Sequence, residues 1–155
     1  MNKMHEIEYL DIEKDKTYND LIKSVLKQCF KEENLSSKDY YINIILTDSN
    51  NIKKINNKYR NIDKETDVLS FPMFEKDEIG KIKLGGQEVL GDIIISIERV
   101  KMQAIEYNHS FERELAYMVV HGFYHIMGED HTNDIEKAQM RQKEEKILKA
   151  LKIER

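Results

Sequence analysis

Apolar residues along the chain follow two different spacings, which separate the expected helices from the expected strands. Over residues 17–30 they recur three or four positions apart, the spacing of an amphipathic helix. Residues 40–47, 68–73 and 91–97 are instead short runs rich in Ile, Leu, Val, Tyr and Phe, which predict strands. A weaker alternation over residues 5–11 predicts a strand at the edge of the sheet.

Polar residues at the expected starts of helices divide the rest of the chain. Asp, Ser and Asn side chains can accept the first unpaired backbone N–H groups of a helix. Four of them precede apolar patterns of helical period: Asp48, Ser96, Ser110 and Asn133. The helix after Asp48 carries three apolar residues on one side: Ile52, Ile55 and Tyr59. The positions expected to pack in the last two helices are Leu115, Met118, Val119, Met140, Ile147, Leu148 and Leu151.

The resulting order of elements is β-α-β-α-β-β-α-α-α, which predicts an α+β fold with one small sheet and helices against it. A chain of 155 residues is expected to form a single domain, residues 1–155, with a sizeable core. The only cysteine, Cys29, lies on an apolar helical stripe and is interpreted as core filler. A lone cysteine is typical of the reducing cytoplasm. No segment approaches the roughly 18 apolar residues that a membrane span needs.

Three of the five histidines lie close together near the C-terminus, in the spacing H-x3-H-x5-H. On a helix, His121 and His125 share one face and can direct both imidazoles to one point. Gly128 can end that helix in a left-handed conformation, so that the chain returns and brings His131 to the same point. Three imidazoles with an open fourth position are the layout of a catalytic zinc site, although an incidental cluster remains an alternative.

The same segment matches the histidines and the glycine of the metzincin protease pattern H-E-x-x-H-x-x-G-x-x-H. In those enzymes the Glu after the first His is the general base. Here that position is Gly122. The ligand arrangement is therefore protease-like, or zincin-like, whereas the usual chemistry of peptide hydrolysis lacks its base.

Three separate stretches resemble the YbeY family. They read N-N-K-Y-R-N-I-D-K-E-T-D-V-L-S-F-P over 56–72, G-D-I-I-I-S over 91–96 and H-G-F-Y-H-I-M-G-E-D-H over 121–131. The resemblance extends in order from about residue 40 to the last motif. Departures from the family pattern are modest and are Glu65 for a proline, Tyr124 and Ile126 for two leucines, and Glu129 for a tyrosine. Glu129 adds a negative charge close to a site expected to face phosphates.

The resemblance implies a metal-dependent endoribonuclease, specific for single-stranded RNA, that acts in small-subunit ribosomal RNA 3′-end maturation and ribosome quality control. It implies a four-stranded mixed sheet with about five helices, and the small ribosomal subunit and assembly factors as partners. It also implies a zinc ion on His121, His125 and His131, with Arg60 holding phosphate. A guanidinium suits that role because its planar fork meets phosphate oxygens in a bidentate way.

The net charge of −4 argues mildly against a nucleic acid partner, so local charge matters more. Lys53, Lys54, Lys58 and Arg60 fall within eight residues. For Lys53 and Lys54 a solvated helix face is favoured over an RNA contact.

Several roles stay open at this level. Asp130 can orient an imidazole or cap the last helix. Asp67 and Asp92 can line the cleft or tie strand ends, and Ser70 can contact RNA or bond to the backbone. The general base can be a nearby carboxylate, hydroxide on the metal or the RNA 2′-OH. The metal can also be nickel, copper or iron. A metalloprotease-like hydrolase and a non-catalytic ribosome-assembly factor remain alternative functions.

Overall fold

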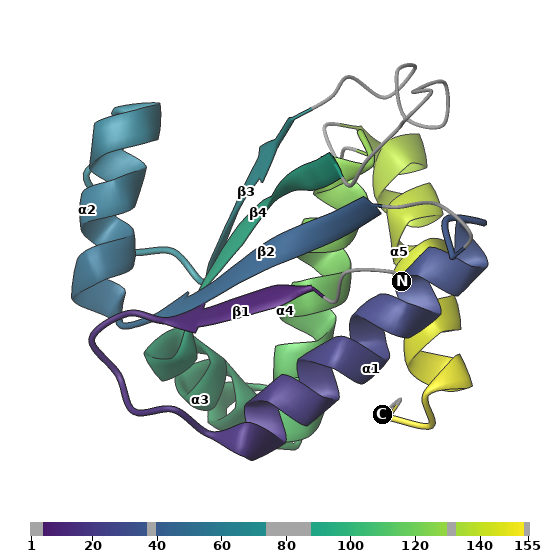
Figure 1. The fold of residues 1–155 in the computed structure, drawn as a ribbon, viewed down its shortest axis with the longest axis horizontal. Coiled ribbons are helices and arrows are strands. Elements are labelled where there is room, and N and C mark those ends of the chain that lie inside the picture. The colour runs from purple at the N-terminus through teal and green to yellow at the C-terminus, as the bar shows by residue number, and fades with distance from the viewer. Residues whose placement is uncertain (1–4, 37–39, 74–87, 130–132, 154–155) are drawn as a thin grey trace.

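Four strands form one mixed sheet at the centre of the molecule (Figure 1). The computed structural model describes residues 5–36, 40–73, 88–129 and 133–153. The strands are β1 (Glu6–Tyr9), β2 (Tyr40–Thr47), β3 (Val68–Pro72) and β4 (Glu88–Ser96). They lie in the order β1-β2-β4-β3, with β1 and β4 parallel to β2 and β3 antiparallel to β4. The predicted mixed sheet and the edge position of β1 are confirmed.

Helices cover the two faces of this sheet unequally. Those formed by the described residues are α1 (Lys16–Glu32), α2 (Ser49–Arg60), α3 (Ile97–Glu106), α4 (Phe111–Ile126) and α5 (Asp134–Ala150). In Figure 1, α2 stands alone on one side of the sheet, while the other four helices gather on the opposite side. The predicted α+β class and the order of elements are both confirmed.

Side chains of the central strands alternate between the two faces, as the period of two in a strand requires. On β2, Ile44 and Leu46 are fully buried in the main core with residues of α1, α4 and α5. Between them, Ile45 packs in a smaller cluster that includes Ile52 of α2 and Ile94 of β4. The face of the sheet that α1, α4 and α5 cover therefore carries the main core, and the opposite face carries a smaller set of contacts with α2.

The predicted helix caps form. Each of Asp48, Ser96, Ser110 and Asn133 accepts a hydrogen bond from the backbone N–H three residues later. After α4 the chain turns through Gly128, which has a φ of 89° in the left-handed region that favours glycine.

Two residues show how far the apolar pattern predicts burial. Cys29 is fully buried, which confirms its interpretation as core filler, and burial raises the pKa of its thiol. Tyr59 is 63% exposed although it shares a side of α2 with Ile52 and Ile55. Its ring lies beside the ring of Phe71, with 5.8 Å between centroids, and the Lys58 ammonium lies over it at 5.2 Å from the centroid. No helix in the described part of the chain is long and apolar enough to cross a membrane.

Candidate active site

Two histidines one turn apart on α4 bring their ring nitrogens together. Because His121 and His125 are four residues apart, both side chains leave the same face of the helix. Their Nε2 atoms are 3.1 Å apart. The rings meet edge to face with 4.6 Å between centroids. The structure thus brings together the two histidines that the i, i+4 spacing pairs.

A carboxylate from α5 holds the other nitrogen of His121. Glu144 Oε2 lies 2.6 Å from His121 Nδ1, and the two side chains are only 7% and 20% exposed. An ionised carboxylate can only accept, so Nδ1 carries the proton and donates it. In the neutral ring, Nε2 of His121 is then the nitrogen with the lone pair, and it lies on the side of His125. This is the tautomer that a metal-ligating imidazole needs.

The spacing of this pair fits a zinc ion. Zinc–nitrogen bonds of about 2.0–2.1 Å place two ligands of a tetrahedral ion about 3.3 Å apart, close to the 3.1 Å between the two Nε2 atoms. The third predicted ligand, His131, lies outside the described residues, as does Asp130. Within the described ranges no group of three or more His, Cys, Asp or Glu side chains could hold a metal ion. The complete, zincin-like site therefore stays a prediction.

Gly122 lies where α4 packs closely against the sheet. A Cβ atom there would be 2.8 Å from Cγ2 of Ile93 and 3.2 Å from Oγ of Ser70. The Ser70 hydroxyl donates a hydrogen bond to the Gly122 carbonyl oxygen at 3.2 Å, which ties β3 to α4. A glutamate at position 122 would have to enter this contact. The position that carries the general base in metzincin proteases is closed here by packing, which disfavours the metalloprotease alternative.

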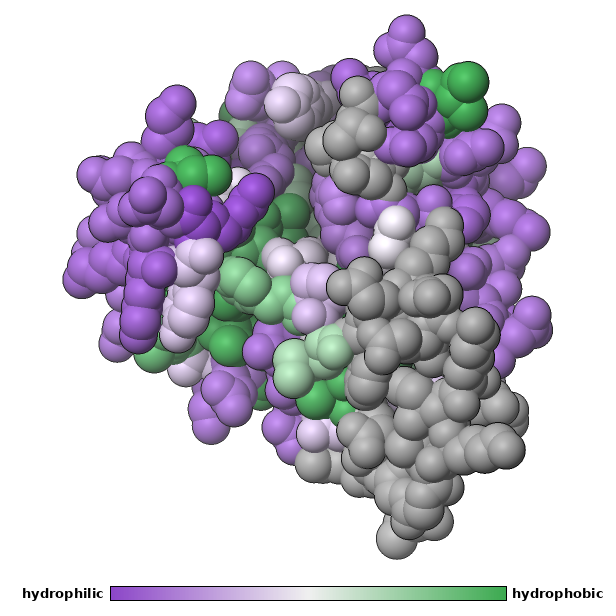
Figure 2. All heavy atoms as spheres, turned by 90° about the horizontal axis from the view of Figure 1, so that it is seen from above, coloured by the Kyte–Doolittle hydropathy of each residue, from purple (hydrophilic) through white to green (hydrophobic). Residues whose placement is uncertain are grey.

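The histidine pair forms one wall of a cleft of about 530 Å³. Arg60, at the end of α2, forms another part of the wall, together with Ser70 of β3 and the loop residue Asp67. Arg60 is exposed, and the chain turns directly after it through Asn61 in the left-handed conformation. Figure 2, seen from above, shows a hollow between the hydrophilic residues on the α2 side, at the left, and the rest of the molecule. Arg60, His121 and His125 thus meet at one cleft.

The other candidate residues divide between the cleft and the framework. Asp67 does both, since it lines the cleft, accepts from the Val68 N–H at 2.8 Å and accepts from Gln103 at 3.3 Å. Asp92 accepts a hydrogen bond from the Asn43 amide at 3.0 Å, across β2 and β4. It is a strand tie and is not among the described residues that line the cleft.

The family departures have local explanations where the structure describes them. Glu129 forms an ion pair with Lys143 of α5, so its negative charge is offset within the protein. Glu65 is exposed in the loop after α2. Neither change removes a residue from the cleft wall.

Glu144 is the site residue that the sequence reasoning missed. The signal was present, because Met140, Glu144, Ile147 and Leu148 share one side of α5 and all four are buried. A carboxylate on an apolar helical stripe needs a buried partner. That partner, His121, lies 23 positions earlier in the chain, so the stripe alone does not identify it.

The fold and this cleft define a class of small α+β proteins in which a histidine pair on one helix faces a cleft beside a mixed sheet. The chain belongs to the YbeY family, since the family model described as "Endoribonuclease YbeY" matches residues 3–152. A protein named Endoribonuclease YbeY from Clostridium botulinum is 43% identical over 157 residues, covering 93% of this chain and 94% of that protein. One of the same name from Acetivibrio thermocellus is 43% identical over 143 residues, covering 88% of each.

A solved structure supports the fold. The solution structure of a Thermotoga maritima protein matches with a TM-score of 0.60 and 28% sequence identity, covering 94% of this chain and 91% of that one. The recognition of the family from three short motifs is therefore confirmed over nearly the whole chain.

Proposed function

We propose that this protein is a zinc-dependent endoribonuclease that cleaves single-stranded ribosomal RNA in the cytoplasm. The observation that carries the proposal is the pair of facing imidazole nitrogens, with Glu144 behind one of them, in a cleft that also contains Arg60. The family supports the nuclease part, because the matched relatives are named endoribonucleases. Maturation of the 3′ end of small-subunit ribosomal RNA and ribosome quality control, with the small subunit and assembly factors as partners, belong to the same proposal.

The proposed zinc ligands are His121, His125 and His131. Glu144 accepts from Nδ1 of His121, so in the neutral ring it is Nε2, on the side of His125, that carries the lone pair for a metal. When bound, a zinc ion would supply Lewis-acid polarisation of a phosphate oxygen and a source of hydroxide near neutral pH. The work of the protein is to hold the imidazoles in place.

Arg60 is proposed to hold the scissile phosphate. Within the described part of the chain its guanidinium makes no hydrogen bond or ion pair, so the fork is available to a ligand. A bidentate contact to phosphate oxygens would orient the RNA backbone and offset the charge that develops during cleavage.

The proton acceptor is proposed to come from outside the described side chains of the cleft. Asp67 is the one carboxylate that the described wall contains. Its oxygens already accept from the Val68 N–H and from Gln103. Asp67 is therefore not the proposed proton acceptor. The nucleophile would be hydroxide, which needs no further base, or the 2′-OH of the RNA, whose proton would pass to hydroxide.

The test uses an end-labelled single-stranded fragment of ribosomal RNA and the same sequence in a duplex. The variants are Arg60→Glu and, as a matched control, Lys54→Glu, which makes the same charge change at an exposed position of the same helix. We expect cleavage of the single strand only, lowered about 100-fold in Arg60→Glu, the cost of removing one charge-stabilising donor, and changed less than about threefold in Lys54→Glu. Equal losses in both variants, with unchanged circular dichroism, would mean that Arg60 contributes only to the general charge of α2.

A further inference from the structure

A second pocket of about 330 Å³ lies next to the proposed cleavage cleft. Asp67 lines both. Tyr117, which lines the second pocket, also lies beside the His121 ring, with 5.5 Å between ring centroids. A ligand in this pocket would therefore share a wall residue, Asp67, with a ligand in the cleft.

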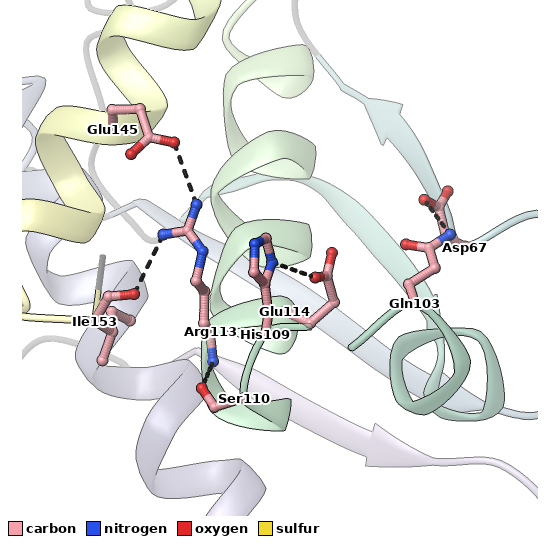
Figure 3. Close-up of polar contacts among 8 residues, drawn as sticks. All are labelled: Asp67, Gln103, His109, Ser110, Arg113, Glu114, Glu145 and Ile153. Atoms are coloured by element: carbon pink, nitrogen blue, oxygen red, sulfur yellow. Dashed lines mark hydrogen bonds and ion pairs between the residues drawn. The ribbon is translucent and has the colours of Figure 1, made fainter. Parts of the chain in front are cut away.

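Hydrogen bonds fix the polar wall of this pocket (Figure 3). His109 Nδ1 lies 3.1 Å from Glu114 Oε2, and the Gln103 amide donates to Asp67 Oδ2 at 3.3 Å. Glu114 is only 3% exposed. The wall is thus a set of held carboxylates and amides, and not a mobile surface.

Flat rings also line the pocket. The rings of Tyr107 and His109 lie with 6.3 Å between centroids, and Tyr117 faces the same pocket. A tyrosine hydroxyl such as that of Tyr117 can donate a hydrogen bond to a ligand.

Two buried nitrogens at this pocket have no hydrogen-bond partner within the described structure, His109 Nε2 and Arg113 Nε. Both side chains line the pocket, and Arg113 is 9% exposed. Buried polar atoms are nearly always satisfied by protein, water or ligand. The His109 nitrogen marks the pocket as a place where a polar ligand has a bond to make, whereas the Arg113 nitrogen belongs to a guanidinium that bonds to Glu145 and the Ile153 carbonyl.

The chemistry of the wall selects the ligand. Figure 3 shows the Arg113 guanidinium turned away from Asp67 and towards Glu145 and the Ile153 carbonyl. The pocket therefore presents carboxylates and amides, which attract N–H donors and repel phosphate. Its volume is at the lower end of the range for small-ligand sites, about 300–1,000 Å³. A flat group with N–H donors on its edge matches this wall.

We propose that this pocket receives the base of a nucleotide adjacent to the scissile phosphate, and that it prefers bases with an exocyclic amino group over uracil. Single-stranded RNA is read by splaying bases out, stacking them on aromatic rings and bonding to their edges. Carboxylates accept from the exocyclic amino group of cytosine. The inference rests on the proposed function, because it makes the pocket a subsite of the same RNA cleft.

The first experiment measures binding of the free nucleosides cytidine and uridine to the zinc-loaded full chain by NMR titration. These probes carry no phosphate and differ in the amino group. We expect cytidine to shift the signals of His109 and Tyr117 and to bind about fivefold to tenfold tighter than uridine, the discrimination of one good base-edge contact. Equal binding of both nucleosides, or no binding at these residues, would overturn the proposal.

Two variants on α3 and its C-terminal cap sharpen the result. Tyr107→Ala removes a half-exposed wall of the pocket, whereas Ile105→Ala changes a residue that is 83% exposed and is not among the described residues that line the pocket. We expect Tyr107→Ala to weaken cytidine binding at least fivefold and Ile105→Ala to leave it unchanged. An equal loss in both variants would assign the shifts to helix distortion and would overturn the subsite.

Cleavage separates this inference from the proposed function. RNA fragments are mapped by the base on each side of the cut, with the wild type and with Tyr107→Ala. A preference for amino-bearing bases that Tyr107→Ala removes supports the subsite. Selective cytidine binding without any RNA cleavage would support the base pocket and contradict the nuclease. RNA cleavage with no base preference and no selective nucleoside binding would support the nuclease and contradict the base pocket.

Discussion

The carboxylate of Glu144 offers the sharpest test of how the histidine pair is held. The change is Glu144→Gln, which keeps the side-chain volume and an oxygen that can accept from His121 Nδ1. What it removes is a negative charge 2.6 Å from the ring, in a pair whose side chains are 7% and 20% exposed. At that depth the charge is poorly screened, and the bond is of the short, charge-assisted kind.

The expected effect is on zinc affinity and not on folding. Loss of a carboxylate behind a ligating histidine typically weakens metal binding by about 10–100-fold, which corresponds to about 1.4–2.7 kcal/mol. The free energy of unfolding of the zinc-free protein is expected to change by less than about 1 kcal/mol, because the hydrogen bond is retained.

The assay is competition for zinc with a chromophoric chelator, alongside chemical denaturation of the zinc-free protein. Glu145→Gln is the matched control, since it makes the same change one position later, on a side chain that is 48% exposed and pairs with Arg113. Zinc affinities of Glu144→Gln and Glu145→Gln within about twofold of the wild type would refute the role given to Glu144.

Three further predictions concern stability. Gly122→Ala is expected to lower the free energy of unfolding by about 1–2 kcal/mol, because its Cβ would lie 2.8 Å from Ile93 and the cost of overpacking exceeds the gain in helix propensity. Urea denaturation measures this change. A stabilised variant would contradict the close packing. Ser110→Ala is expected to lower the free energy of unfolding by about 1 kcal/mol, because the cap bond from the Arg113 N–H is lost. Ser36→Ala, at an exposed position outside the helices, should leave it almost unchanged. Melting temperatures of the two variants check this difference. Burial lowers the pKa of His5 from 6.5 to about 4, so its contribution to stability is present above pH 6.5 and is lost as the pH falls to about 4; the loss is at most about 3 kcal/mol. His5→Gln should flatten that part of the pH profile, and an unchanged profile would mean that His5 is not buried neutral.

Local patterns predicted the elements of this fold well. Strand and helix periods follow from each segment's own residues, and the caps at Ser110 and Asn133 need only the next three residues. The pairing of His121 with His125 is local for the same reason, because one helical turn joins them. These features form wherever the segment is placed in the fold, so the sequence is sufficient to predict them.

Features that depend on packing between distant segments were not accessible in this way. Glu144 meets His121 only because α5 crosses α4, and no short motif contains both residues. In the sequence, Gly122 shows only that the glutamate base of the metzincin pattern is absent. In the structure, its lack of a side chain lets α4 pack against Ile93. The second pocket depends on Asp67 meeting Gln103, 36 positions away.

The most direct test of the account is the zinc content of the purified chain, measured by elemental mass spectrometry for the wild type and for His121→Ala, with both preparations assayed on the same single-stranded ribosomal RNA fragment. The account predicts one zinc per chain in the wild type, and loss of both zinc and cleavage in the variant, while circular dichroism shows that the fold is kept. Cleavage that persists in a zinc-free, folded His121→Ala variant would contradict the claim that the histidine cluster is the catalytic centre.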